Sequence, residues 1–162
     1  MNISVFRIDD RLIHGQIVTA WVNYADARQI VVADDKASKD EFQKTLLKMA
    51  TPKSVELHIL NLEEAFKMIS EGDDTKKTLL LVRGPKEALA IVDACKNLKS
   101  INVGNLNMKK GKTKVLGNLW VEASDITAFD ALSKKGILTE VRAVPNDRSL
   151  DVIELLKKEK LI

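Results

Sequence analysis

The residues best suited to chemistry lie together near the start of the chain, in the segment Arg7-Ile8-Asp9-Asp10-Arg11-Leu12-Ile13-His14-Gly15-Gln16. His14 is one of two histidines in the sequence. Its imidazole can act as a nucleophile, because an unperturbed pKa near 6.5 leaves it substantially neutral at pH 7. The segment lies between an apolar strand and a helix, whose free N–H groups and partial positive charge suit a phosphate. These features indicate a histidine that carries a phosphoryl group.

Arg11 is the candidate phosphate-binding side chain, three residues before His14. A guanidinium forms paired hydrogen bonds to phosphoryl oxygens and keeps its charge near neutrality, and positive charge stabilises the transition state of phosphoryl transfer. The loop amides of Leu12, Ile13 and Gly15 are expected to bind the same phosphate, and Gly15 gives the backbone freedom to approach it closely. We therefore expect Arg11 and the loop backbone to form one anion site.

Two aspartates precede Arg11 and would repel an incoming phosphate, so a supporting role is expected of them. An aspartate could orient His14 or Arg11, or accept N–H groups of the loop and hold its shape. Asp10 is the favoured supporting residue, and the role of Asp9 is left open. Alternatively, Arg11 could form a simple surface ion pair with either aspartate. Arg7 could have no role other than to brace the loop.

The decapeptide and the following Ile17-Val18-Thr19-Ala20-Trp21 resemble the active-site signature of the IIB components of the mannose-family sugar phosphotransferase system. That family includes transporters for mannose, fructose, sorbose and N-acetylgalactosamine. Weaker matches follow in the expected order and span almost all of the chain. They are Val31-Val32-Ala33-Asp34-Asp35, Lys48-Met49-Ala50-Thr51-Pro52, Ile101-Asn102-Val103-Gly104-Asn105 and Val144-Pro145.

The resemblance implies a phosphoryl relay. A phosphohistidine on a IIA protein or domain donates its phosphoryl group to Nδ1 of His14, and His14 passes it to a sugar bound by membrane IIC and IID subunits. The site is then expected to be shallow and accessible to both partners, in a cytoplasmic protein held at the inner face of the membrane through IIC and IID. No cofactor or metal is expected. The identity of the sugar and the possibility that the chain forms a homodimer are left open.

Two hypotheses from other classes remain beside the relay. One is a non-catalytic module that binds a small molecule or nucleotide at the same loop, which predicts a deep pocket and no covalent phosphate. The other is a regulatory protein that accepts phosphate from IIA on His14 and has no transport partner.

Composition supports one domain over residues 1–162, long enough to bury about two-thirds of its unfolded surface. The chain is 45% hydrophobic and 30% charged, its apolar runs are too short to cross a bilayer, and its first residues do not form a signal peptide. A single cysteine gives no sign of an oxidising compartment. Aromatic residues do not interleave with the lysines at 109, 110, 112 and 114, so nucleic acid is not expected as a partner.

Several other motifs favour structural roles. Asp34-Asp35 could form a magnesium-binding receiver pocket, but such pairs commonly cap helices, and the pair could also frame the site. The sequence Gly104 to Thr113 ends like a nucleotide-binding loop, yet Leu106 stands where that loop needs glycine. His58 and Trp21 are expected to be surface and packing residues, and Cys95 a buried thiol. The role of the 109–114 loop is left open.

The apolar pattern predicts an α/β fold with a mainly parallel central sheet and helices on both faces. Apolar or alternating runs predict strands at Ile3–Ile8, Gln29–Ala33, Val55–Ile59, Thr78–Val82, Ser100–Val103 and Ile137–Val144, with a short strand near Trp120. Caps and 3.6-residue periodicity predict helices beginning at Gly15, after a Ser38/Glu41 capping box, after Asn61, at Pro85, after Ser124 and near Ser149. In the second of these, Phe42, Leu46 and Met49 recur on one helix face.

Overall fold

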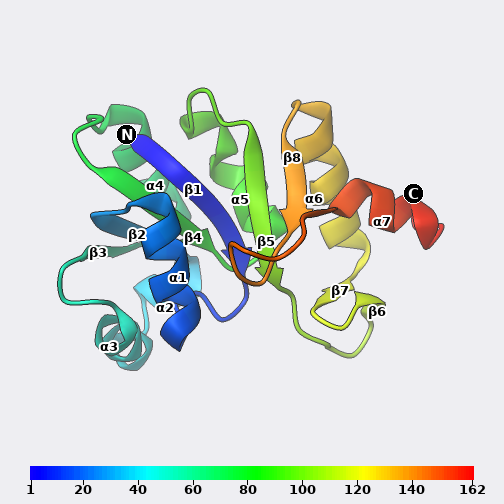
Figure 1. Ribbon diagram of the computed structural model, residues 1–162, viewed down its shortest axis with the longest axis horizontal. Coiled ribbons are helices and arrows are strands. Elements are labelled where there is room, and N and C mark those ends of the chain that lie inside the picture. Colours follow the sequence, from blue (N-terminus) through cyan, green and yellow to red (C-terminus); the bar gives the residue numbers. More distant parts are fainter.

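The computed structural model describes all 162 residues as strands and helices arranged around one seven-stranded sheet (Figure 1). The strands lie in the order β3-β2-β4-β1-β5-β8-β9. Every neighbouring pair is parallel except β8 and β9, so the predicted mainly parallel sheet is confirmed. The seven strands are β1 (Asn2–Asp9), β2 (Gln29–Ala33), β3 (Glu56–Leu60), β4 (Lys77–Val82), β5 (Ser100–Asn105), β8 (Leu138–Val141) and β9 (Leu150–Asp151).

Helices cover both faces of the sheet, as predicted. One apolar cluster holds residues of α1 (Gly15–Ala25), α2 (Asp35–Ser38) and α3 (Glu41–Ala50). The larger cluster, on the other face, holds residues of the remaining helices. These are α4 (Leu62–Glu71), α5 (Pro85–Ile91), the 3-10 turn η1 (Val92–Ala94), α6 (Ala123–Lys134) and α7 (Val152–Lys158).

The central strands are continuous apolar runs because both of their faces are buried. All five residues of β2 are buried, and its side chains alternate between the two apolar clusters, with Val31 in the larger and Val32 in the smaller. β3 lies at one edge of the sheet, as its alternating pattern predicts. The predicted short strand near Trp120 is β7 (Leu119–Val121), which pairs with β6 (Thr113–Leu116) outside the main sheet. None of the helices has the length and apolar character needed to cross a membrane.

Three helix starts differ from prediction because carboxylates, rather than serines, supply the caps. The Asp40 side chain accepts the Gln43 N–H at the start of α3, whereas Ser38 ends α2. α6 begins after Glu122, two residues before the predicted cap Ser124. The last helix begins after Asp151, because the preceding two residues pair with β8 as β9.

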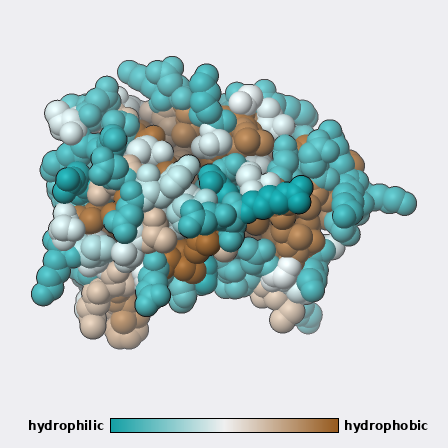
Figure 2. Space-filling view, viewed as in Figure 1, coloured by the Kyte–Doolittle hydropathy of each residue, from teal (hydrophilic) through white to brown (hydrophobic).

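The stripe of Phe42, Leu46 and Met49 has the predicted helical spacing, but it faces solvent. Their exposed fractions are 73%, 49% and 78%, and Leu47 is the only fully buried residue of α3. Figure 2 shows this apolar surface at the lower left of the molecule, over the helix labelled α3 in Figure 1.

The carboxyl ends of four adjacent strands place polar residues along one edge of the sheet. Asp9 ends β1, Asp34 follows β2, Arg83 follows β4 and Asn105 ends β5. Since these strands are parallel, all four side chains lie at the same edge, which is where open α/β sheets bind their ligands. We call it the carboxyl edge.

Candidate functional site

His14 lies at the carboxyl edge, at the end of the loop between β1 and α1. It is the residue that precedes the first helical residue, with extended backbone (φ −137°, ψ 97°). Its carbonyl oxygen accepts the Ile17 and Val18 N–H groups at 3.1 and 3.4 Å. Its side chain is exposed and does not cap the helix. The imidazole is therefore available to an incoming group.

The loop is held by its apolar residues rather than by its charges alone. Leu12 and Ile13 are buried and belong to the smaller apolar cluster, so His14 is presented from a fixed base. Leu12 has a φ of 59° and Gly15 a φ of 44°. A positive φ costs a bulky residue such as Leu12 free energy, which its burial offsets.

Two of the three expected phosphate-binding amides have no hydrogen-bonding partner. The Leu12 N–H donates to the Asp9 carbonyl oxygen at 2.9 Å, so it is already used. The N–H groups of Ile13, Gly15 and Gln16 make no such bond. They lie at the amino end of an 11-residue helix, where the backbone carries partial positive charge.

Asp9 is the carboxylate that holds Arg11. Its Oδ1 accepts the Arg11 backbone N–H and Nε–H, both at 3.0 Å, and its Oδ2 accepts Arg11 Nη2–H at 2.9 Å. Asp9 is 1% exposed, whereas the Arg11 side chain is 29% exposed. This hydrogen bonding raises the pKa of Arg11 above its ordinary value. A fixed, charged guanidinium thus lies in the loop that carries His14, with part of its surface open to solvent.

Arg7 lies behind Asp9 and is buried. Its Nη2 donates to Asp9 Oδ2 at 3.2 Å and to the Ala143 carbonyl oxygen at 3.1 Å. Its Nη1 donates to the Asn102 side chain, and the guanidinium lies 4.8 Å from the centre of the Trp21 ring. Burial lowers the pKa of Arg7 to about 10, which still leaves it charged at pH 7. Arg7 therefore braces the loop, which is the role suggested for it from the sequence.

Asp10 makes no hydrogen bond or ion pair with Arg11 or His14, so the expected orienting of Arg11 is done by Asp9, and the preference for Asp10 as the supporting residue stays a prediction. Its carboxylate accepts the Asn105 side-chain amide at 2.9 Å and the Asn107 backbone and side-chain amides at 2.6 and 3.1 Å. Neighbouring carboxylates in a sequence leave a strand on opposite sides, and only the fold decides which one meets the arginine. A catalytic role for Asp10 stays a prediction.

Arg83 is a site residue that sequence reasoning missed. It donates to both oxygens of Asp34, at 3.1 and 3.0 Å, and to the Asp10 carbonyl oxygen at 3.1 Å. Asp34 also accepts the Ala37 N–H and so caps α2, while Asp35 accepts the Leu62 N–H. Its position could have identified it from the sequence, because Arg83 directly follows a buried strand and so lies at the carboxyl edge. The pair Asp34-Asp35 is thus engaged in caps and an ion pair, and no group of acidic, His or Cys side chains could hold a metal.

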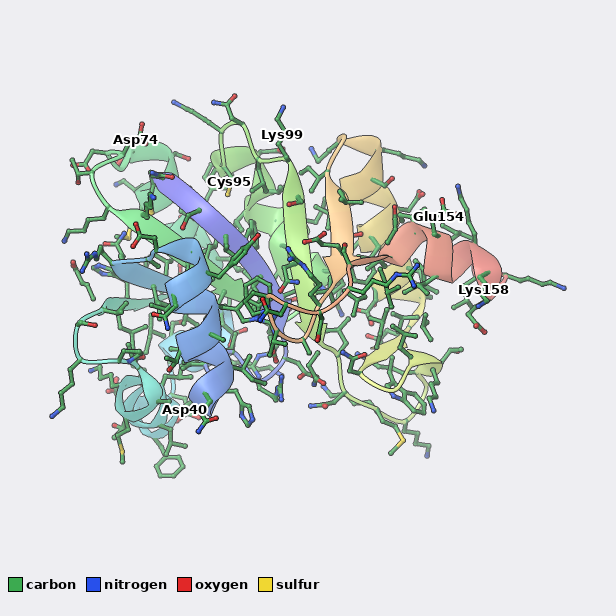
Figure 3. The ribbon with its side chains drawn as sticks, in the orientation of Figure 1. Asp40, Asp74, Cys95, Lys99, Glu154 and Lys158 are labelled. Carbon is green, nitrogen blue, oxygen red and sulfur yellow. The ribbon has the colours of Figure 1, made fainter.

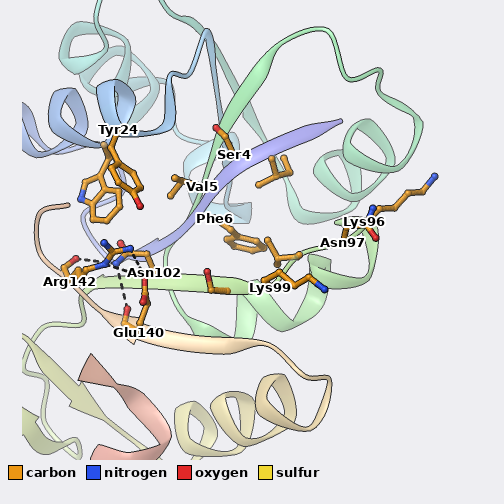
Figure 4. Close-up of a pocket in the computed structure, with 14 residues that line it drawn as sticks. Ser4, Val5, Phe6, Tyr24, Lys96, Asn97, Lys99, Asn102, Glu140 and Arg142 are labelled. Carbon is orange, nitrogen blue, oxygen red and sulfur yellow. Dashed lines mark hydrogen bonds and ion pairs between the residues drawn. The ribbon is translucent and has the colours of Figure 1, made fainter. Parts of the chain in front are cut away.

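His14 does not line any of the five main cavities of the molecule. One of about 230 Å³ lies between α1 and the strands β1, β5 and β8, and is lined by Trp21, Tyr24, Asn102, Glu140 and Arg142 among others (Figure 4). A second, of about 260 Å³, touches Asp10 and Arg83. His14 lines neither of them, so it lies on an exposed surface rather than in a deep pocket.

Besides the second histidine, His58, Cys95 is a side chain that could act as a nucleophile, and it lies at the opposite edge. It follows η1 and precedes the amino end of β5, and Figure 3 shows it far from Asp40, which is next to the carboxyl edge. Cys95 is buried, and burial raises the pKa of its thiol to about 12. It is therefore an inert thiol, whereas the His58 Nε2 lies 2.9 Å from a Glu56 carboxylate oxygen on the exposed face of the edge strand β3.

Comparison with known proteins gives consistent matches over the whole chain. Residues 3–162 match the family model described as the sorbose-subfamily IIB component of the phosphotransferase system. The chain is 33% identical over 158 residues to the fructose-specific EIIB component of Bacillus subtilis, covering 97% of each chain. It is 33% identical over 159 residues to the mannose-specific EIIAB component of Escherichia coli, covering 98% of this chain and 49% of that protein. The crystal structure of the IIBSor domain of the Klebsiella pneumoniae sorbose permease superposes with a TM-score of 0.92 at 29% identity, covering 98% of each.

Proposed function

Because the chain belongs to the sorbose-subfamily IIB components of the sugar phosphotransferase system, and so is a phosphoryl carrier in sugar transport, we propose that His14 is the residue that carries the phosphoryl group. The observation that carries the proposal is an exposed imidazole in the same short loop as a fixed, charged guanidinium and at the start of a helix with unpartnered N–H groups. Cys95, the one other soft nucleophile, is buried with a raised pKa at the opposite edge.

The proposed step exchanges one P–N bond for another. A ring nitrogen of neutral His14, Nδ1 by resemblance to the family, attacks the phosphorus of a phosphohistidine on IIA. The P–N bond of the donor breaks, and its electron pair returns to the donor imidazole. In the second step a sugar hydroxyl oxygen attacks the same phosphorus, the bond to His14 breaks, and the hydroxyl proton leaves to solvent or a base. Neither step changes an oxidation state.

Arg11 and the loop backbone would stabilise the charge that spreads over the three transferring oxygens. Removing one such donor from a phosphoryl or acyl site costs about 10²–10³ in rate in other enzymes. Asp9 and Arg7 fix Arg11 before the phosphate arrives, so little reorganisation is needed during the reaction. Both carboxylates accept hydrogen bonds from arginine or amide groups, and these partners offset the negative charge that would repel a phosphate.

We further propose that the chain works on the cytoplasmic side, next to membrane subunits of the IIC and IID type, and receives its phosphoryl group from a IIA partner. The EIIAB relative supports the IIA assignment, because its name joins an A part to a part that matches this chain. The sugar is left open, since the relatives are named for fructose, N-acetylgalactosamine, sorbose and mannose.

The test follows labelled phosphate from phosphoenolpyruvate through the two general phosphotransferase proteins and the IIA protein of the same transport system. Wild-type protein, His14→Ala and Cys95→Ser are compared. Label that is acid-labile and base-stable on the wild type and on Cys95→Ser, and absent from His14→Ala, is the expected result.

Equal labelling of wild type and His14→Ala contradicts the proposal. Label that appears on His14 but is never passed to any sugar, in membranes that contain IIC and IID, favours the regulatory alternative instead.

A further inference from the structure

Trp21 is buried, as expected of a packing residue, but its indole also binds the segment that holds Arg7. Its Nε1–H donates to the Ala143 carbonyl oxygen at 3.0 Å. The same oxygen accepts the Nη2–H of Arg7 at 3.1 Å, and the Arg7 guanidinium lies 4.8 Å from the centre of the Trp21 ring. Trp21 therefore contacts Arg7 directly through its ring, and indirectly through a shared carbonyl oxygen.

The carbonyl oxygens that hold Arg7 belong to residues 142–147, which directly follow β8. The Arg142 and Ala143 carbonyl oxygens accept Arg7 N–H groups at 2.9 and 3.1 Å, and the former also accepts the Asn102 side-chain amide at 3.2 Å. A guanidinium donates hydrogen bonds and accepts none, so a buried one is held in place by the acceptors around it. The position of the 142–147 segment therefore determines where the Arg7 guanidinium lies.

The 142–147 segment forms no helix or strand, so side-chain contacts have to hold its shape and its place. Within the segment, Asp147 Oδ2 accepts the Ala143 and Val144 N–H groups at 3.2 and 3.3 Å. The indole N–H of Trp21 ties the segment to α1, the helix that begins directly after the His14 loop.

Arg7 in turn holds the carboxylate that orients Arg11. Asp9 Oδ2 accepts hydrogen bonds from Arg7 and from Arg11, at 3.2 and 2.9 Å. A shift of Arg7 would therefore move Asp9 and turn the Arg11 guanidinium away from the phosphoryl oxygens. His14 has a separate support, because buried apolar residues anchor the loop before it.

We propose that Trp21 is a positioning residue for phosphoryl transfer, because it holds the chain of contacts that ends at Arg11. The proposal rests on the proposed function, because it needs Arg11 to stabilise the transferring group at His14. Misplacing a group that stabilises the transition state lowers the rate of the chemical step, whereas losing a docking contact raises KM. Replacing Trp21 is therefore expected to change the rate at saturating phospho-IIA and to leave KM for phospho-IIA unchanged.

The test compares Trp21→Phe with wild type in the rate of phosphoryl transfer to His14 as a function of phospho-IIA concentration. Phenylalanine keeps most of the apolar volume and an aromatic face, and it removes the indole N–H. The rate at saturation is expected to fall about tenfold. Trp120→Phe is the matched control, because Trp120 also donates its Nε1–H to a backbone carbonyl oxygen, that of Gly117 at 3.3 Å. This control should transfer at the wild-type rate.

A second pair of variants tests the same segment without disturbing the core. Asp147 is exposed, and Asp147→Ala removes the acceptor that closes the 142–147 segment. The rate at saturation is expected to fall about threefold. Asp73→Ala removes an exposed carboxylate that accepts the Thr75 N–H in the turn before β4, and it should transfer at the wild-type rate.

An Arg11→Ala background separates positioning from a merely structural role. Because Trp21 is proposed to act through Arg11, Trp21→Phe/Arg11→Ala is expected to transfer no more slowly than Arg11→Ala alone. A loss by the same factor in both backgrounds overturns the proposal. So does a wild-type rate at saturation in Asp147→Ala or in folded Trp21→Phe, or a change confined to KM. Absence of label from wild-type His14 overturns the proposed function itself.

Discussion

At the scale of single residues, Asp9 is the side chain on which the charge balance of the site depends. It is buried and accepts hydrogen bonds from two arginines, Arg7 behind it and Arg11 in front. One carboxylate therefore compensates two guanidiniums, and the remaining positive charge is directed to the exposed side, where a phosphoryl group would arrive. Arg7 is further satisfied by carbonyl oxygens and Asn102, so its charge is held without a second acid.

Arg11→Lys is expected to slow phosphoryl transfer although it conserves the charge. A lysine ammonium cannot reproduce the fork that binds both oxygens of Asp9 and still presents donors to a phosphate. We expect the rate at saturating phospho-IIA to fall by about 10²-fold. Arg28→Lys, on the exposed turn before β2 at the opposite edge, is the matched control and should transfer at the wild-type rate.

Asp9→Asn is expected to destabilise the fold as well as the site. It leaves the buried Arg7 without its carboxylate, and breaking a buried ion pair costs about 3–5 kcal/mol. The free energy of unfolding in urea measures this loss. Asp130→Asn, which breaks the exposed pair with Lys134, should change the free energy of unfolding far less, because solvent screens that pair. Equal losses in the two variants would contradict the role given to Asp9.

At the scale of elements, the loop after β1 is positioned by the ends of its two neighbouring strands. Arg83 after β4 holds the Asp10 carbonyl, and Asn105 at the end of β5 holds its carboxylate. Beneath them, Gly104 on β5 leaves room for the Arg7 side chain, because a Cβ at this position would lie 2.0 Å from Arg7 Nη2. The glycine is thus required by packing rather than by its backbone conformation.

Gly104→Ala is expected to displace Arg7 and loosen Asp9. We expect a loss of about 1–3 kcal/mol in the free energy of unfolding, the usual cost of overpacking, together with slower transfer to His14. Gly117→Ala provides the control, because a Cβ there meets no atom within 4 Å. Thermal unfolding of both variants checks the difference, and a Gly104→Ala protein as stable as Gly117→Ala would contradict the packing argument.

Helices and strands could be predicted from the sequence where a local pattern of residues defines them. The contacts between side chains of different elements could not. Buried strands such as Gln29–Ala33 read directly as apolar runs, and Pro85 marked the first residue of α5. Which aspartate binds Arg11 depends on the directions in which the side chains of Asp9 and Asp10 point. Arg83, which binds the Asp10 carbonyl oxygen, lies 73 positions further along the chain. Phe42, Leu46 and Met49 have the spacing of a buried helix face, and only the tertiary structure shows that this face is exposed to solvent.

At the scale of the whole molecule, the two edges of the sheet differ in character. The carboxyl edge carries His14 and its arginines, whereas Cys95 lies near the amino edge. The proposed chemistry is therefore expected at the carboxyl edge only.

Modification of Cys95 checks this division. Burial raises the pKa of its thiol to about 12, so the thiolate is scarce at pH 8 and alkylation by iodoacetamide should be more than about a hundredfold slower than for free cysteine. The raised pKa stabilises the fold below the ordinary thiol pKa, and that contribution is lost as the pH rises through about 12. Rapid alkylation of the native protein at pH 8 would contradict the burial.

Under the proposed function, the exposure of His14 also limits how long the phosphorylated protein can keep its phosphoryl group. Because His14 is exposed, water can reach a phosphoryl group on its imidazole, and water is itself a phosphoryl acceptor. An idle carrier would lose its group by hydrolysis, and the cell would spend phosphoenolpyruvate without gaining sugar. An exposed histidine that two partners can reach is therefore expected to hold its phosphoryl group only briefly. The protein is suited to rapid phosphoryl transfer rather than to a long-lived phosphorylated state.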